Sequence, residues 1–283
     1  MQYSIENDIL RLTVDSHGAE PVSVIHKPTE AELLWQADPA VWNRHAPILF
    51  PYTGKLTGGK MLAKGVEYAG GQHGFARDVE HTMTLHADNL LEFELHANAE
   101  TLPKWPYAFV LRSTFTLEGE TVHHTLTVEN PVEDKLCFGI GYHPAFALPF
   151  DDRHVTEDYE IRFDGVESPL CVSAQPNGLL NGQSYYLARN VEAIQLTDDL
   201  FDNDSHAMVN LRSAHVSVIE KDTGRSVICD VSDFPYTLIW SAPKKPLHFI
   251  CIEPWHSLPG EENGPIDLSL IHISEPTRLA LIS

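Results

Sequence analysis

Hydrophobic and polar residues alternate with a period of two along most of this chain, whereas a period near 3.6 is rare. Successive side chains of a strand point to opposite faces, so this alternation predicts strands with one buried face. No capped amphipathic run reaches about twelve residues, and we therefore expect no long helix. The predicted strands include Ile9–Val14, Val22–His26, His81–Leu85, Leu91–Leu95, Lys135–Tyr142, Tyr159–Phe163, Ala193–Leu196, Met208–Leu211, Tyr236–Ser241 and His248–Glu253.

Two pairs of these segments are joined by short turns. Phe109–Leu117 and Thr121–Val128 flank a Glu-Gly-Glu turn, and His215–Lys221 and Ser226–Val231 flank a turn that contains Gly224. Such spacing is typical of β-hairpins. With many strands, short turns and no alternation of strands and helices, the pattern predicts an all-β fold, a large antiparallel β-sandwich.

Composition narrows the class of protein further. The chain has 283 residues, 43% of them hydrophobic, and a formal net charge of -21. This is enough apolar material for one large domain, and no segment resembles a linker. Nucleic acids and anionic membranes need clustered Lys and Arg, so the acidic balance argues against both as partners and favours a small ligand. No apolar run reaches the roughly 18 residues of a membrane span.

Cysteine usage indicates a reducing compartment. The four cysteines are irregularly spaced without a C-x-x-C motif, and the first residues lack the basic and apolar regions of a signal peptide. We expect reduced thiols and a cytoplasmic location.

Three sites combine reactive side chains with unusual backbone signals. The stretch from Arg44 to Asp78 contains prolines and glycines, and near its end His73 lies between Gly71 and Gly74. His143 ends a predicted strand just before a proline, and Glu253 ends the apolar run that starts at Phe249. A proline ends the hydrogen-bonded ladder of a strand, and a glycine allows the backbone to approach a neighbour closely. Both therefore favour a side chain that projects from the end of a strand. The alternatives are a solvated loop histidine, a hydrogen-bonded core histidine and a Glu paired with Lys or Arg.

Other motifs do not indicate chemistry. Gly54–Lys60 fits G-x-x-x-x-G-K, but Met61 follows instead of Ser or Thr, which argues against a nucleotide phosphate loop. His123 and His124 are neighbours in a predicted strand, so they point to opposite faces and cannot chelate one metal. We expect neither a metal site nor an organic cofactor.

Four motifs in order carry a resemblance to a known family. The segments PILFPYTGKL, QHGFARD, GYHPAF and ICIEPWHSLPG resemble those of the aldose 1-epimerase (galactose mutarotase) family, in particular its LacX-like branch. The resemblance extends from about residue 1 to Leu268. It implies the galactose mutarotase-like β-supersandwich, with a sugar site on the concave face of a large sheet.

The resemblance also implies residue roles. His73 and His143 match the two family histidines, Glu253 matches the catalytic glutamate, and Arg77 matches a substrate-binding arginine. In this interpretation Glu253 is the base toward the anomeric hydroxyl O1, His143 is the acid toward the ring oxygen O5, and His73 orients that oxygen.

The remaining binding positions are assigned in the same way. Asp204, or alternatively Asp202, matches an aspartate that holds sugar hydroxyls, and Trp255 offers a flat face to a sugar ring. Lys55 stands where many family members have arginine. The bidentate guanidinium is replaced there by an ammonium group, so we expect a weaker contact with the sugar, or none, at this position.

The implied activity is mutarotation of a cyclic aldose of the glucose or galactose type, without a cofactor, in a monomer or weak homodimer. Alternatives are a hexose-6-phosphate mutarotase and a non-catalytic sugar-binding protein on the same fold. A glycoside hydrolase would need two carboxylates, and only Glu253 lies in such a motif.

The end of the chain departs from the family pattern. We predict that residues 1–268 form the domain, and that residues 269–283 are a non-native tail that does not contribute to the fold.

Overall fold

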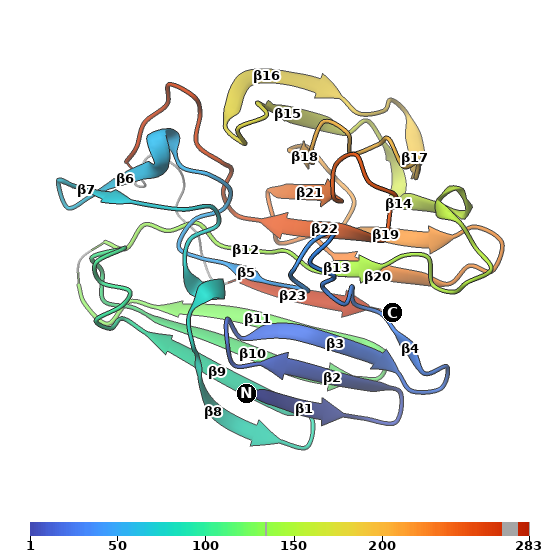
Figure 1. Ribbon diagram of the computed structural model, residues 1–283, viewed down its shortest axis with the longest axis horizontal. Coiled ribbons are helices and arrows are strands. Elements are labelled where there is room, and N and C mark those ends of the chain that lie inside the picture. Colours follow the sequence, from blue (N-terminus) through green and yellow to red (C-terminus); the bar gives the residue numbers. More distant parts are fainter. Residues whose placement is uncertain (134, 268–276, 283) are drawn as a thin grey trace.

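Strands dominate the computed structural model of the chain, which describes residues 1–133, 135–267 and 277–282 (Figure 1). Helical structure in these ranges is limited to three short 3-10 helices, and none is long and apolar enough to cross a membrane. The all-β prediction is therefore confirmed. The helices are η1 (Thr57–Gly59), η2 (Ala76–Asp78) and η3 (Thr156–Asp158).

Two large antiparallel sheets form the body of the molecule. The nine-stranded sheet has the order β17-β14-β19-β20-β23-β11-β10-β9-β8, with β17 Val191–Gln195, β14 Tyr159–Glu167, β19 His215–Glu220, β20 Ser226–Asp230, β23 Thr277–Ile282, β11 Thr121–Glu129, β10 Val110–Glu118, β9 Leu90–His96 and β8 Thr82–Ala87. The second sheet has the order β16-β15-β18-β21-β22-β12-β5, with β16 Leu180–Tyr186, β15 Leu170–Ala174, β18 His206–Met208, β21 Tyr236–Trp240, β22 Phe249–Trp255, β12 Gly141–Tyr142 and β5 Ile48–Leu49, and β13 (Ala145–Ala147) also pairs with β22.

Two smaller sheets complete the fold. One has the order β1-β2-β3-β4, with β1 Gln2–Glu6, β2 Leu10–Asp15, β3 Glu20–His26 and β4 Ala31–Glu32. The other is the hairpin of β6 (Lys60–Ala63) and β7 (Val66–Ala69), which projects to one side in Figure 1.

The central strand of the second sheet, β22, is buried along its whole length. Ile250 and Ile252 contribute to the main hydrophobic core, together with residues of the nine-stranded sheet such as Val216 and Val218. The opposite face of β22 carries Glu253. Side chains alternate between the two faces of a strand, and both faces of β22 are covered. The strand can therefore be apolar almost throughout and still carry one carboxyl group into the interior.

A tyrosine joins the two large sheets near that strand. The hydroxyl of Tyr142 on β12 donates to the carbonyl oxygen of His124 at 2.9 Å and accepts from the amide of Leu126 at 3.1 Å, both on β11. The imidazole of His124 is buried and lies 2.7 Å from the hydroxyl of Ser113. His124 is thus a hydrogen-bonded core residue.

Both predicted hairpins are confirmed, since β10 pairs with β11 and β19 with β20. Two predicted strands are wrong in extent. Lys135–Tyr142 is strand only at Gly141–Tyr142, and Met208–Leu211 is strand only at Met208, where β18 ends. Both segments are apolar because they are partly buried, and burial alone does not distinguish a loop from a strand.

The predicted tail differs from the structure over part of its length. β23 lies between β11 and β20, with Thr121 opposite Ile282 and Ile228 opposite Ile282 on the other side. This segment therefore completes the nine-stranded sheet instead of lying outside the fold. Residues 268–276 and 283 are outside the described residues, and the foreign origin of the tail stays a prediction.

Deleting residues 277–283 is expected to lower the melting temperature by several degrees, because the backbone groups of β11 and β20 lose their shared partner. Leu281→Pro tests the same pairing in the full-length chain, since proline removes the backbone donor of a residue that faces both neighbours. Thermal unfolding of both variants measures the effect. Unchanged melting temperatures would show that the tail lies outside the fold.

Candidate active site

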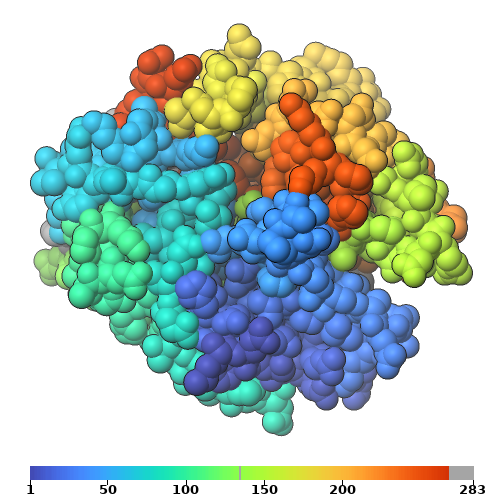
Figure 2. Space-filling model, in the orientation of Figure 1, coloured from blue at the N-terminus to red at the C-terminus, as the bar shows by residue number. Residues whose placement is uncertain are grey.

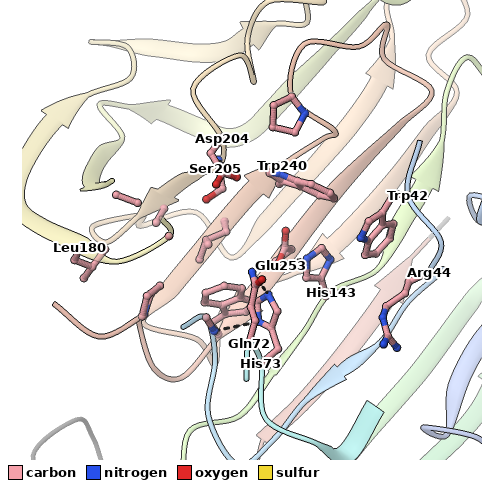
Figure 3. Close-up of a pocket in the computed structure, with 18 of the residues that line it drawn as sticks. Trp42, Arg44, Gln72, His73, His143, Leu180, Asp204, Ser205, Trp240 and Glu253 are labelled. Atoms are coloured by element: carbon pink, nitrogen blue, oxygen red, sulfur yellow. Dashed lines mark hydrogen bonds and ion pairs between the residues drawn. The ribbon is translucent and has the colours of Figure 1, made fainter. Parts of the chain in front are cut away.

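A cavity of about 420 Å³ opens on one face of the molecule, and Figure 2 shows a hollow between the segments coloured blue, cyan and orange. Residues from both halves of the chain line it, as Figure 3 shows. Its size suits a small ligand such as a monosaccharide. The lining includes Trp42, Arg44, Gln72, His73, Arg77, His143, Asp204, Ser205, Trp240, Glu253 and Trp255.

Glu253 and His143 face each other in this cavity. Glu253 is 1% exposed and His143 7% exposed, and Oε2 of the carboxyl lies 3.2 Å from Nε2 of the imidazole. Glu253 comes from β22 and His143 follows β12, which pairs with β22 at Gly141. Neighbouring strands of one sheet thus place an acid and a base side by side.

Burial controls the protonation of this pair. Burial, reinforced by the charge of Asp204, raises the pKa of Glu253 well above its usual range. Burial, together with the positive charge of Arg77, lowers the pKa of His143 to about 3. Low dielectric disfavours the charged form of each group. These directions favour a protonated Glu253 beside a neutral His143, so the pair carries one proton.

His73 lies on the loop that leads to η2, in a backbone conformation that is rare outside glycine, with φ 66°. A Cβ at the following Gly74 would lie 2.0 Å from the carbonyl oxygen of Phe50, so only glycine allows this close approach. The amide of Gly54 donates to Nδ1 of His73 at 3.0 Å. A backbone amide cannot accept, so a neutral His73 carries its proton on Nε2 and acts as a donor.

Gln72 and Arg77 surround that donor. The side-chain nitrogen of Gln72 lies 3.1 Å from Nε2 of His73, and because both nitrogens are donors in this tautomer, the two groups form a hydrogen bond only with the carboxamide flipped so that its oxygen accepts. The guanidinium of Arg77 donates to the carbonyl oxygen of Gln72 at 2.9 Å. The Nε of Arg77 is buried without a hydrogen-bond partner among the described residues. An unmet buried donor at a cavity wall is suited to a ligand oxygen.

Asp204 lies across the cavity from these groups (Figure 3). It too has a positive φ, 79°, and its carboxylate accepts from the amide of Ser205 at 2.9 Å. Asp202 is exposed and does not line the cavity. Strained backbone at a cavity is a common feature of functional positions, and it favours Asp204 over Asp202.

Aromatic rings close the remaining side. Trp42 stacks on His143 with ring centroids 5.0 Å apart, Trp240 meets His143 edge-on at 5.6 Å, and Trp255 meets His73 edge-on at 5.4 Å. The indole nitrogen of Trp255 donates to the carbonyl oxygen of Tyr142 at 3.2 Å, which fixes the ring.

The structure brings six of the seven predicted residues to this cavity, and Lys55 is the exception. The backbone of Lys55 bridges to Gln72, and a Cβ at Gly178 would lie 3.2 Å from Cδ of Lys55, which shows where the side chain runs. Lys55 thus runs along Gly178, which lines the cavity, and its charge adds to burial in lowering the pKa of His73.

Sequence reasoning assigned no role to Trp42, Arg44, Gln72 or Trp240, which also line the cavity. Gln72 directly precedes His73 in the QHGFARD segment, and its place in that segment could have identified it as a cavity residue. Nothing in the period-two pattern marks Trp42 or Trp240 as cavity residues.

Two clusters of described residues have metal-ligand atoms within 4.8 Å of one another, His143 with Cys251 and Glu253, and Asp151 with His154 and Glu220. Burial raises the pKa of Cys251 well above its usual range, and a protonated thiol is a poor ligand. The second cluster already contains a cation, because Arg225 pairs with Asp151 and Glu220 at 2.7 Å.

Comparison with known proteins gives one consistent result. The family model described as aldose 1-epimerase matches residues 1–264. The plasmid-encoded protein LacX of Lactococcus lactis subsp. lactis is 33% identical over 266 residues, which cover 91% of this chain and 88% of LacX.

Solved structures agree. A galactose mutarotase related enzyme from Lactobacillus acidophilus superimposes with a TM-score of 0.92 at 30% identity, covering 100% of this chain and 97% of that protein. A galactose mutarotase-like protein from Lactobacillus casei gives 0.87 at 31% identity, with 100% and 99% covered. The chain belongs to the aldose 1-epimerase family.

Proposed function

We propose that this protein is a mutarotase that interconverts the α and β anomers of a cyclic aldose of the glucose or galactose type. The observation that carries the proposal is the buried pair of Glu253 and His143, 3.2 Å apart, in a cavity of monosaccharide size. Opening a cyclic hemiacetal needs one proton removed from O1 and one delivered to O5. An acid and a base that share a single proton supply both transfers.

The proposed reaction conserves protons. The Glu253 carboxylate takes the proton of the anomeric hydroxyl while the C1–O5 bond breaks, and the His143 imidazolium protonates O5. The product is the open-chain aldehyde, with Glu253 protonated and His143 neutral. Rotation about C1–C2 exposes the other face of the aldehyde, and the reverse transfers close the ring to the opposite anomer.

The resting position of the proton sets the first step. The pKa directions favour the proton on Glu253, which matches the protonation of the open-chain stage. In this proposal, ring opening from a cyclic sugar begins after this proton has moved from Glu253 to His143, over 3.2 Å and against both pKa directions.

Other cavity residues bind and orient the sugar in this proposal. His73 donates from Nε2 to the ring oxygen, which requires the amide of Gln72 to give way. Arg77 offers its unmet Nε to a hydroxyl, and Asp204 accepts from hydroxyls at the opposite wall. Trp255 supplies an apolar face to the ring. Lys55 is not assigned a sugar contact.

Polarimetry on freshly dissolved α-glucose, α-galactose and glucose 6-phosphate tests the function directly. We expect the protein to accelerate the decay of optical rotation for at least one of the two unphosphorylated sugars. Acceleration of the phosphorylated sugar alone would favour a hexose-6-phosphate mutarotase, in which Arg44 and Arg77 meet the phosphate. Binding without acceleration would favour a sugar-binding protein.

Glu253→Gln is expected to lower kcat by about 10²–10⁴-fold, because the amide keeps the size of the side chain but cannot accept the proton. The variant is also expected to be more stable than the wild type at pH 8. Because the folded-state pKa of Glu253 lies above its ordinary value of 4.5, the folded protein holds this proton longer. Stability therefore falls as pH rises from 4.5 through the folded-state pKa, and this loss is absent in the variant.

Melting temperatures of both proteins at pH 5 and pH 8 measure this difference, and it should widen at pH 8. Glu20→Gln is the matched control, since this buried carboxylate accepts two backbone hydrogen bonds, from His45 and Ala46, and its loss should destabilise. A wild-type rate in Glu253→Gln would remove Glu253 from the mechanism.

The pH dependence of kcat should be bell-shaped, because the active pair carries one proton and both limbs belong to the pair. His143→Asn is expected to lose most of the rate. Its residual rate should rise with pH through the raised pKa of Glu253 and then stay level, since only ionisation of the base remains. Sugar affinity should change by less than about tenfold, roughly 1.4 kcal/mol. A retained alkaline limb would shift the role of acid to His73.

A further inference from the structure

The imidazole of His143 is held in an unusual way. Its Nε2 faces Glu253 at 3.2 Å, whereas its Nδ1 is buried without a hydrogen-bond partner among the described residues. Reactive histidines are ordinarily oriented by a hydrogen bond at the second ring nitrogen. Apart from an interaction with its own backbone, no hydrogen bond from a described residue orients the ring, so contacts with other rings must contribute.

Aromatic rings provide that contact. Trp42 lies face to face with His143, with centroids 5.0 Å apart and an interplanar angle of 22°. Trp240 and His73 meet the same ring edge-on, at 80° and 86°. Figure 3 shows His143 between Glu253 on one side and Trp42 on the other. The indole is thus the stacked face against which the imidazole rests.

Trp42 is itself fixed by its neighbours. Its carbonyl oxygen accepts from the indole nitrogen of Trp35 at 2.8 Å, and its amide donates to the carbonyl oxygen of Asp38 at 2.9 Å. Its ring stacks on Phe249 at 5.5 Å and 27°. A side chain held at both backbone and ring can position another ring with little freedom.

We propose that Trp42 is a positioning residue for His143, which holds the imidazole toward Glu253 and stabilises its protonated form during the reaction. The proposal deepens the proposed function and rests on it. The face of an indole attracts a cation, so stacking on Trp42 favours the imidazolium that the acid step requires.

The other groups around His143 make this stabilisation necessary. The positive charges of Arg77 and Arg44 disfavour an imidazolium, the thiol of Cys251 is neutral, and the imidazole of His73 is neutral and donates from Nε2. The backbone of His143 itself favours the charged ring through a hydrogen bond, and Glu253 does so once it has given up its proton. Trp42 favours the imidazolium without changing its own charge.

Replacement of Trp42 by Leu and by Phe separates ring stacking from filling of space. Trp42→Leu is expected to lower kcat about tenfold, the scale of a desolvated cation–π contact, while KM stays within about threefold. Trp42→Phe keeps an aromatic face and should retain more than half of kcat. Affinity for 1-deoxyglucose, which binds but cannot open, should be unchanged within about threefold in both variants.

A measurement on the protein without sugar tests the positioning role of Trp42 independently of the proposed mutarotase activity. The relaxation of the His143 ring ¹³Cε1 signal, assigned by its absence in His143→Asn, should report a rigid ring in the wild type and in Trp42→Phe, and a mobile ring in Trp42→Leu. A rigid ring in Trp42→Leu would overturn the positioning role, whether or not the protein is a mutarotase. A raised KM with unchanged kcat would overturn it in favour of direct sugar contact by Trp42.

Discussion

The buried carboxyl and imidazole of Glu253 and His143, 3.2 Å apart at the wall of a cavity, are the constraint on which the rest of this structure depends. Burial favours the neutral form of both Glu253 and His143, so neither group is held in a permanent ionic bond. An ionised pair would be costly to desolvate, so burial favours the proton on the carboxyl beside a neutral imidazole. The two groups that would exchange this proton lie at a fixed distance of 3.2 Å.

The sheets fix the distance between Glu253 and His143. β22 is covered on both faces, so its even-numbered side chains enter the core while Glu253 enters the cavity. β12 pairs with β22 at Gly141, and Tyr142 ties β12 to β11 of the other sheet. The pair thus stands on strands of one sheet, which the Tyr142 hydroxyl links to the backbone of the other sheet, and loop residues line the cavity around it.

The sequence predicted most of this arrangement, for physical reasons that differ from residue to residue. Alternation revealed the all-β fold and the hairpins, and Glu253 was recognisable because a carboxylate at the end of an apolar strand needs an explanation. Lys55 does not line the cavity because its side chain runs along Gly178, a contact that no local pattern encodes. Trp42 was missed because its partner His143 is about a hundred residues away in the chain, and ring stacking leaves no periodic signal.

The two histidines of the cavity are held by different means, and the difference matches what each has to do. His73 accepts a backbone hydrogen bond at Nδ1, which locks its proton on Nε2 and makes it a permanent donor. No other described residue hydrogen-bonds Nδ1 of His143, so a change of charge there breaks no bond to a neighbouring side chain. Stacking constrains the plane of a ring without constraining its protonation state. In the proposed mechanism the charge of His143 changes in every turnover, and such a residue is better held by an aromatic face than by a hydrogen bond.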